Sequence, residues 1–298
     1  MVTLSKEQLR EVQLTELEIL KEAHRICEKH GIPYVIIAGT LLGAVRHQFF
    51  IPWDDDVDIA MLRPDYERFR EVCETELDRE RFVFQDDRNT PGYRWGYGKL
   101  RRKDTLFLRE HQEHMPYFQG IFLDVFPLDE VPAPYMLRRV FDLRCYIIRK
   151  FLWAKAGKRA DGRPLFRLLY GLMDLVPEKT VLGAYHRLIG RSRAIERKAR
   201  AEEERGRRRK RFVRILMFPA PNGAGGYLRG WYTHRKRYLF EDGSFWGVRN
   251  ADDYLRFKFG DYMTPPAEEE RKTHPVSRLK LLSESGTGAD RSRQEPDS

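Results

Sequence analysis

Four aspartates stand at the start of a strand-like segment, IPWDDDVDIAM, which covers residues 51–61. In an extended chain Asp54, Asp56 and Asp58 share one face, and the apolar side chains that alternate with them share the other. Two ionised carboxylates about 4 Å apart repel each other by roughly 4 kcal/mol at an effective dielectric constant of about 20. The cluster therefore indicates a cation site, and its oxygen-only ligands favour Mg²⁺ or Mn²⁺. A solvated acidic turn is the alternative interpretation.

A glycine-containing turn precedes this segment. The five residues from Gly39 to Gly43, GTLLG, follow a strand pattern and open a helix pattern. Backbone N–H groups in the first turn of a helix bind anions, so those of this turn and the Thr40 hydroxyl are candidates to hold a phosphate. A glycine-rich turn by itself is weak evidence for such a role.

One carboxylate is isolated in a later strand pattern. Asp124 lies in the apolar segment IFLDVFPL of residues 121–128. An unpaired carboxylate is costly to bury in such a strand. Participation in a metal site would remove that cost, and so would an ion pair with an arginine. Asp124 is therefore a candidate metal ligand together with Asp54, Asp56 and Asp58.

The segments that must position these residues alternate between helix and strand. Apolar side chains at helical spacing follow the capping-box pattern Ser5-x-x-Gln8, and Gly31 is a typical helix end. Apolar and β-branched runs bounded by Gly and Pro predict the strands. The predicted order is a helix over residues 5–30, a strand over 33–39, a helix over 40–47, a strand over 57–61 and a helix over 63–77.

Later segments indicate an α+β fold in which a mixed β-sheet core of about five strands has flanking helices and a helical insertion. Further strand-like segments cover residues 81–86, 94–102, 121–129 and 237–248, and a helix pattern covers 251–260. Residues 135–214 lack strand patterns, which predicts a helical insertion over about 133–215 in a single domain of residues 1–275. The polar residues 276–298 predict a disordered tail.

Composition limits the class of protein. Of 298 residues, 41% are hydrophobic and 12% aromatic, which allows a large core and excludes a wholly disordered chain. The three cysteines, Cys27, Cys73 and Cys145, form no Cys-x-x-Cys pair, so neither a disulfide framework nor a cysteine zinc site is indicated. The N-terminus lacks an apolar signal core, and no apolar run is long enough to span a bilayer, so we expect a cytoplasmic protein.

The net charge of +10 is concentrated in one segment. Residues 191–214 contain twelve Lys or Arg and four Glu, an excess of eight positive charges. The apolar run 212–218 overlaps and follows them, which predicts peripheral contact with an anionic membrane at its inner face. A solvated helix is the alternative. Nucleic acid is a less favoured partner, because no RRM, KH or OB pattern accompanies the charge.

The spacing of these elements resembles the nucleotidyltransferase superfamily, in which a Gly-Ser/Thr turn precedes an Asp-x-Asp strand and a third carboxylate arrives on a later strand. More specifically, AGTLLGAVRHQFFIPWDDDVDIAM, residues 38–61, is similar to the signature of the LicD family, which includes bacterial phosphorylcholine transferases and relatives of the fukutin-related proteins. The similarity continues through DYERF (65–69), GKLRRKDT (98–105), FLDVFPLD (122–129), FGDYM (259–263) and the His-Pro pair at 274–275.

The resemblance implies a LicD-like catalytic domain in residues 1–275. Its expected activity is transfer of a phospho-alcohol, such as phosphocholine, from a CDP-linked donor to a hydroxyl of a cell-surface glycan, lipopolysaccharide or teichoic acid precursor, with release of CMP. The resemblance implies Asp56 and Asp58 as Mg²⁺ ligands and Asp124 as a third ligand or as the base. Asp54 is a weaker candidate ligand. The alternative activity is that of a nucleotidyltransferase, which attaches a nucleoside monophosphate to its acceptor.

Three more residues are candidates for substrate binding. Arg46 and Lys99 carry charges that suit a pyrophosphate, and a surface ion pair is the alternative role for each. Trp53 could stack on the base of the donor, although a large aromatic side chain beside a proline more often belongs to a core. A lipid-linked glycan acceptor would explain contact of a cytoplasmic enzyme with a membrane.

Overall fold

The computed structural model describes residues 4–207, 209–271 and 273–283. In this part of the chain nine strands form a mixed sheet of order β3-β4-β6-β2-β1-β10-β9, to which β7 is added at β6 and β8 at β7. The strands are β1 (Val35–Ile36), β2 (Asp58–Leu62), β3 (Phe82–Gln85), β4 (Gly98–Arg102), β6 (Phe122–Val131), β7 (Phe212–Arg214), β8 (Tyr227–Leu228), β9 (Arg235–Phe240) and β10 (Gly243–Val248). The predicted α+β fold is confirmed. The estimate of about five strands was too low, because strands as short as β7 and β8 leave little pattern in a sequence.

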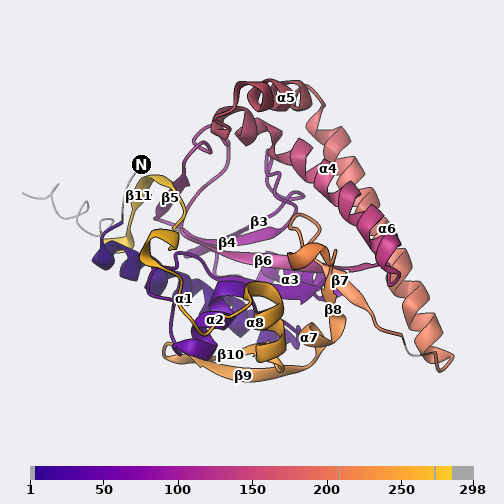
Figure 1. The fold of residues 1–298 in the computed structure, drawn as a ribbon. Helices are drawn as coiled ribbons and strands as arrows, with labels where there is room; N and C mark the ends of the chain where they lie inside the picture. Colours follow the sequence, from indigo (N-terminus) through magenta and orange to yellow (C-terminus); the bar gives the residue numbers. More distant parts are fainter. Residues whose placement is uncertain (1–3, 208, 272, 284–298) are drawn as a thin grey trace, which may run out of the picture.

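The helices lie on both sides of the sheet. Figure 1 shows α4, α5 and α6 on one side of β6 and α1, α2 and α8 on the other. Their bounds are α1 (Lys6–His30), α2 (Ala38–Arg46), α3 (Arg63–Glu76), α4 (Tyr135–Ala160), α5 (Pro164–Asp174), α6 (Glu178–Glu204), α7 (Arg229–Thr233) and α8 (Ala251–Phe259), with 3₁₀ turns at Pro221–Gly223 and Glu268–Glu270. Within the described residues, no helix combines the length and the apolarity needed to cross a bilayer.

The first helix has the ends that the sequence predicts. Ser5 Oγ accepts a hydrogen bond from the Gln8 N–H at 3.2 Å, and Gln8 Oε1 accepts one from the Ser5 N–H at 3.0 Å. Gly31, at the other end, has the left-handed φ of 58° that ends helices readily. The capping box and the C-terminal glycine are confirmed, and the apolar face of α1 is buried in the core.

Two parallel strands carry the acidic residues to one place. β2 and β6 pair in parallel, and Asp58 stands opposite Asp124 in their register. On the other side of β6, antiparallel β4 brings Lys99 opposite Asp124. Directly paired positions point their side chains to the same face of a sheet. Three charged residues that are distant in sequence are thus placed side by side.

The chain between β6 and β7 forms three helices with a core of their own. Phe141, Cys145, Leu188 and Ile189 belong to a buried cluster that is separate from the cluster around the sheet. The expected insertion, residues 133–215, also includes β7, which pairs antiparallel with β6. The last residues of that range therefore belong to the sheet.

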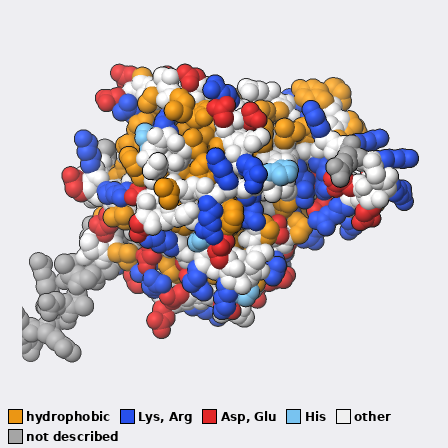
Figure 2. All heavy atoms as spheres, turned by 90° about the horizontal axis from the view of Figure 1, so that it is seen from below, with side chains coloured by type: hydrophobic (Ala, Val, Ile, Leu, Met, Phe, Trp, Pro, Cys, Tyr) orange, Lys and Arg blue, Asp and Glu red, His pale blue; other side chains and the backbone are white. Residues whose placement is uncertain are grey.

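The apolar run 212–218, which was predicted to contact a membrane together with the basic segment 191–214, is partly buried. Val213, Leu216 and Met217 are buried, so this part of the run belongs to the core and is not free to contact a membrane. Figure 2 shows Lys and Arg side chains gathered at the end of the molecule where α6 ends. In the described part of the segment, five arginines form ion pairs within the protein: Arg193, Arg200, Arg209, Arg211 and Arg214.

The prediction of a disordered tail from residue 276 onward is wrong for its first residues. Val276–Lys280 form β11, which pairs antiparallel with β5 (Leu106–Arg109) in a separate two-stranded sheet. Val276 is fully buried, whereas most side chains of β11 are at least partly exposed, which explains the polar composition of the strand. Residues 284–298, the rest of the predicted tail, lie outside the described residues.

Candidate active site

A cavity of ≈ 350 Å³ lies beside the first residues of β2 and β6. We call it the acidic cavity because three of the four predicted metal ligands line it. It brings together three carboxylates and three basic side chains: Asp56, Asp58, Asp124, Arg109, Lys258 and His274. The other lining residues are Ile37, Ala38, Tyr97, Phe126, Ile215, Phe218, Pro219 and Tyr227.

Two carboxylates of this cavity lie in surroundings that disfavour their charge. Burial raises the pKa of Asp58 well above its ordinary value, and the negative charges of Asp56 and Asp124 raise it further. Burial also raises the pKa of Asp56, while His274 acts in the opposite direction. The carboxylates repel each other as they stand, and a cation bound among them would relieve that repulsion.

Asp124 is paired with a buried lysine. The Lys99 Nζ donates a hydrogen bond to Asp124 Oδ1 and lies 3.4 Å from the centroid of the Phe122 ring. Burial lowers the pKa of Lys99 to about 7, although the charge of Asp124 acts against this shift. The alternative of a surface ion pair for Lys99 is therefore wrong, because only 4% of the residue is exposed. The isolated carboxylate of Asp124 both lines the cavity and has an ion-pair partner.

The donor atoms of the acidic cavity are of the type that Mg²⁺ and Mn²⁺ bind. Asp56, Asp58 and Asp124 offer carboxylate oxygens, and their burial as like charges is what a divalent cation would neutralise. Among the residues that the structure describes, however, no three His, Cys, Asp or Glu side chains are already grouped as metal ligands. One oxygen of Asp124, Oδ1, already accepts a hydrogen bond from Lys99. Binding of Mg²⁺ is therefore a proposal.

Asp54, the remaining predicted ligand, is not among the residues that line the cavity. A Cβ added at Gly39 would stand 2.4 Å from Asp54 Oδ2, so the carboxylate lies against the first turn of α2. Glycine permits this approach, and the N-terminal end of a helix favours negative charge. Burial, together with the charges of Asp56 and Asp55, raises the pKa of Asp54 well above its ordinary value.

Asp55 positions a histidine of the cavity. Asp55 is 1% exposed; its Oδ2 accepts a hydrogen bond from the His274 N–H at 2.9 Å, and its Oδ1 lies 3.0 Å from His274 Nδ1. His274 Nε2 in turn lies 3.8 Å from Asp56 Oδ2. Sequence reasoning chose the alternate aspartates by strand periodicity and so passed over Asp55.

Thr40 and Gly43 are likewise not among the residues that line the cavity. The Thr40 hydroxyl accepts a hydrogen bond from the Asp58 N–H at 2.9 Å and so ties the start of β2 to α2. A Cβ added at Gly43 would stand 2.6 Å from the Phe49 carbonyl oxygen, so glycine is needed for close packing. α2 begins at Ala38, which does line the cavity, and the helix N-terminus therefore lies at its edge.

Arg46 and Trp53 contact the C-terminal part of the chain. Arg46 Nη1 donates a hydrogen bond to the Tyr262 carbonyl oxygen at 2.7 Å. The Arg271 guanidinium lies 4.4 Å from the centroid of the Trp53 ring, and Trp53 packs partly buried against the core. The structure therefore does not bring these two candidate substrate-binding residues to the acidic cavity.

Two basic side chains of the cavity were missed by sequence reasoning. Arg109 ends β5, and its Nε is buried with no hydrogen-bond partner among the described residues. Lys258 lies on α8, where burial lowers its pKa while the charges of Asp58 and Asp56 oppose that shift. No local spacing signals either residue, because only the folding of β5 and α8 against the sheet brings them to the aspartates.

A further acidic side chain is buried close enough to the aspartates of residues 54–58 for their charges to raise its pKa. Glu16, on α1, is fully buried, and neither of its carboxylate oxygens has a hydrogen-bond partner in the described chain. Burial raises the pKa of Glu16 well above its ordinary value, and the charges of Asp56, Asp55, Asp54 and Asp58 raise it further. Folding therefore favours the neutral form of Glu16 over the charged form.

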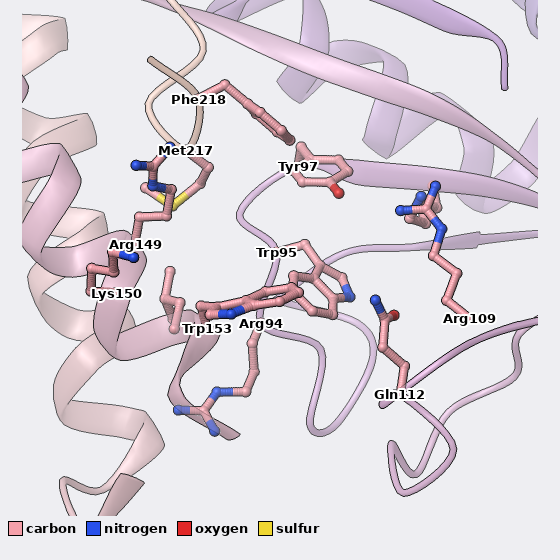
Figure 3. Close-up of a pocket in the computed structure, with 12 residues that line it drawn as sticks. Arg94, Trp95, Tyr97, Arg109, Gln112, Arg149, Lys150, Trp153, Met217 and Phe218 are labelled. Atoms are coloured by element: carbon pink, nitrogen blue, oxygen red, sulfur yellow. The ribbon is translucent and has the colours of Figure 1, made fainter. Parts of the chain in front are cut away.

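A second cavity, of ≈ 340 Å³, adjoins the acidic cavity and is shown in Figure 3. The two cavities share Tyr97, Arg109 and Phe218. The rings of Trp95 and Trp153 have centroids 5.5 Å apart in its wall. The other lining residues are Arg94, Lys99, Gln112, Arg149, Lys150, Leu152 and Met217. This aromatic pocket has no carboxylate among its described lining residues, so it suits an anionic group attached to a ring.

Comparisons with known proteins agree with the motifs. Residues 31–136 match the LicD/FKTN/FKRP nucleotidyltransferase domain. The chain is 26% identical over 287 residues to the lipopolysaccharide cholinephosphotransferase LicD of Haemophilus influenzae, covering 94% of this chain and 100% of that protein. It is also 28% identical over 173 residues to an uncharacterized protein of Rickettsia prowazekii, covering 56% of this chain and 59% of that one.

The matched domain contains the chemistry of the acidic cavity. Asp54, Asp56, Asp58, Asp124 and Arg109 all lie within residues 31–136, and the full-length similarity extends beyond them. The resemblance found in the sequence motifs is thereby confirmed. Residues 31–136 belong to the LicD/FKTN/FKRP nucleotidyltransferase domain family, and the chain is similar to a lipopolysaccharide cholinephosphotransferase over nearly its whole length.

Proposed function

We propose that this protein transfers a phospho-alcohol, with phosphocholine the first candidate, from a CDP-linked donor to a hydroxyl of a cell-surface glycan precursor. The observation that carries the proposal is the acidic cavity, in which Asp56, Asp58 and Asp124 share one space with Arg109 and Lys258. The similarity to a lipopolysaccharide cholinephosphotransferase supports the choice of donor and acceptor. An acceptor related to lipopolysaccharide or teichoic acid follows from the same argument.

Each charged group of the cavity has a proposed role. Asp56 and Asp58 would hold Mg²⁺, with Asp124 as a third ligand or as the base, and the ion would neutralise the charge of the pyrophosphate when bound. Arg109 and Lys258 would donate hydrogen bonds to phosphate oxygens. Arg109 suits this role best, because its Nε has no partner among the described residues.

The proposed reaction forms one bond and breaks one. The acceptor hydroxyl oxygen bonds to the β-phosphorus of the donor. The bond between that phosphorus and the oxygen that bridges to the α-phosphorus breaks, and CMP leaves with the electron pair. The hydroxyl proton passes to a base, for which Asp124 is the candidate. The main tasks of the protein are then to align the two substrates and to stabilise the charge of the phosphate oxygens.

The two proposed roles of Asp124, base and metal ligand, can be distinguished by experiment. As the base alone, Asp124→Asn would slow transfer by about 10²-fold or more and leave Mn²⁺ affinity unchanged. As a third ligand, the same change would weaken Mn²⁺ binding as well. If both rate and affinity stayed at the wild-type level, Asp124 would be only the ion-pair partner of Lys99.

The aromatic pocket is the proposed site of the acceptor glycan. Indole rings pack against sugar rings, and Arg149 and Lys150 suit phosphate or carboxylate groups on them. Since Tyr97 and Arg109 belong to both cavities, a sugar held there can present a hydroxyl to the donor. Trp153→Ala should raise the acceptor KM about tenfold and leave donor hydrolysis nearly unchanged. An equal loss in both assays would place the donor in this pocket instead.

The direct test of the proposal compares donors. The purified chain would be incubated with CDP-choline, CDP-ribitol, CDP-glycerol and nucleoside triphosphates, with and without Mg²⁺. Release of CMP from a CDP-linked donor supports the proposal. Release of pyrophosphate from a nucleoside triphosphate, with a nucleotide left on the acceptor, would show the nucleotidyltransferase activity instead.

A further inference from the structure

One stripe of large apolar side chains on α4 is left uncovered by the described chain. Met136, Val140, Leu143 and Ile147 follow one another at intervals of four, three and four residues, which places them on one face of the helix. They are 71%, 48%, 57% and 46% exposed. An apolar stripe of this kind normally faces a partner.

The next helix carries a second exposed stripe. Leu165, Leu168, Leu169 and Leu172 are spaced for one face of α5, and each is at least 40% exposed. Leu175, just after the helix, is 77% exposed. Tyr170 is the buried residue that α5 contributes to the packing below it.

The two stripes belong to one surface. Ala154 follows Ile147 by seven residues and so continues the stripe of α4, yet it is fully buried. α5 packs on this half of α4, since a Cβ added at Gly157 would stand 2.9 Å from Tyr170 Cδ2. α5 therefore covers the second half of the stripe and presents its own leucines outward. We call this surface the α4–α5 face; Figure 1 shows α5 at the end of the molecule opposite β9.

The same segment is strongly basic. Residues 135–175 contain ten Lys or Arg and three Asp, an excess of seven positive charges. Arg144 and Arg167 are exposed and have no carboxylate partner within the described residues. Each of the three aspartates is already paired with a cation of the chain, Asp142 with Arg214, Asp161 with Arg163, and Asp174 with Lys158.

We propose that the α4–α5 face docks this protein on an anionic membrane surface. Leucine side chains enter the boundary between headgroups and acyl chains, while arginines meet lipid phosphates. A second copy of the chain is a poorer partner, because a two-fold interface would bring two basic faces together. Nucleic acid would match the charge but would leave the leucines in water. The bilayer matches both properties at once.

Docking through this face would also affect access of the acceptor to the aromatic pocket. This consequence rests on the proposed function. The middle of α4 supplies Arg149, Lys150 and Trp153 to the aromatic pocket, between the exposed stripe and the half that α5 covers. A bilayer against the α4–α5 face would therefore bring this pocket near lipid-linked acceptors. The water-soluble nucleotide donor needs no such contact.

The test measures co-sedimentation of the full chain with vesicles of phosphatidylcholine and phosphatidylglycerol. The double variant Leu168→Gln/Leu172→Gln should bind these vesicles about tenfold more weakly or worse, at low and at high salt. Arg144→Gln/Arg167→Gln should weaken binding at low salt, and the difference from wild type should shrink at high salt. Vesicles of phosphatidylcholine alone should retain less of the wild type.

A matched control separates this face from the basic segment predicted from the sequence. Arg207→Gln/Lys210→Gln removes two exposed charges beyond the end of α6 and should change vesicle binding much less than the leucine variant. If the control loses binding while the leucine variant keeps it, docking belongs to residues 191–214 and the proposal is overturned. Equal binding by wild type and the leucine variant would overturn it as well.

Two further measurements keep the result unambiguous. Circular dichroism and the thermal midpoint should show all three double variants folded, because the changed side chains are exposed. Light scattering shows the oligomeric state. If the leucine variant turned a dimer into a monomer without losing vesicle binding, the face would be a self-association surface instead. Donor hydrolysis should stay at the wild-type rate, so failure of docking is distinguishable from failure of the proposed chemistry.

Discussion

At the scale of single residues, the acidic cavity combines like charges that are buried or partly buried with partners that hold them in place. The Thr40 hydroxyl binds the Asp58 N–H, Asp55 holds His274, and Lys99 pairs with Asp124. These contacts fix the backbone and the neighbours of the carboxylates without removing the repulsion among them. The arrangement is thus costly to stability in the absence of a cation, as at many functional sites.

The first residue-scale prediction concerns Asp58. Asp58→Ala should leave the thermal midpoint of the metal-free protein unchanged or raise it, because a partly buried like charge is removed. The same variant should bind Mn²⁺ more weakly and lose transfer activity by about 10²-fold or more. Asp253→Ala, an exposed change on α8, is the matched control and should behave as wild type. Wild-type Mn²⁺ affinity in Asp58→Ala would end its assignment as a ligand.

The second residue-scale prediction concerns Glu16 and pH. Burial raises its pKa above the ordinary 4.5, so the folded state holds the proton more tightly than the unfolded state. The contribution of Glu16 to the free energy of unfolding is fully present below the pKa of the unfolded state. It is lost as pH rises through the higher pKa of the folded state. Glu16→Gln should therefore gain stability over wild type as pH rises above the ordinary pKa of 4.5. Urea unfolding of the metal-free protein at several pH values measures this, and a constant difference across the range would contradict the argument.

At the scale of elements, the close packing of α2 against the chain that leads into β2 decides where the aspartates lie. A Cβ at Gly43 would meet the Phe49 carbonyl oxygen at 2.6 Å and the Ile51 nitrogen at 3.3 Å. Neither backbone atom can move without displacing the segment that carries the aspartates. The helix, the loop and the strand therefore act as one unit in placing the cavity.

This packing gives a matched pair of glycine substitutions. Gly43→Ala should lower the free energy of unfolding by about 1–3 kcal/mol, because backbone atoms block the new methyl group. Gly183→Ala, inside α6, meets nothing within 4 Å and should raise it by about 0.5–1 kcal/mol, because alanine favours a helix. Denaturant titration of both variants checks the pair; a shift of the same sign in both would show that the packing around α2 is not the cause.

Elements also show how far the sequence could predict the structure. The long amphipathic α1, the DDDVDIAM strand and α3 follow from periodicity, caps and turn residues, and all three are present near their predicted bounds. β7, β8 and β11 were missed because their sequences show no clear alternation of apolar and polar residues. They are strands because they pair with strands that are distant in the sequence. Arg109 and Lys258 were missed for the same reason, since tertiary contacts alone bring them to the cavity.

At the scale of the whole molecule, the sequence and the structure favour different surfaces for membrane contact. The segment 191–214 has the greater excess of positive charge, but its apolar neighbours are buried and several of its arginines are paired. Residues 135–175 looked like ordinary helices, because a sequence does not show which apolar face stays uncovered. Exposure, which only the fold determines, moves the proposed membrane contact from the first segment to the second.

The whole molecule is proposed to join an acidic cavity for the donor, an aromatic pocket for the acceptor and a face for the membrane. ³¹P NMR of CDP-choline with a glycan acceptor and Mg²⁺ follows cleavage of the donor and transfer to the acceptor in one experiment. The proposed transfer predicts that CMP and a new phosphodiester appear at equal rates with wild type and that both are absent with Asp58→Asn. CMP release by Asp58→Asn at the wild-type rate, or pyrophosphate release from CTP in place of CMP release, would contradict it.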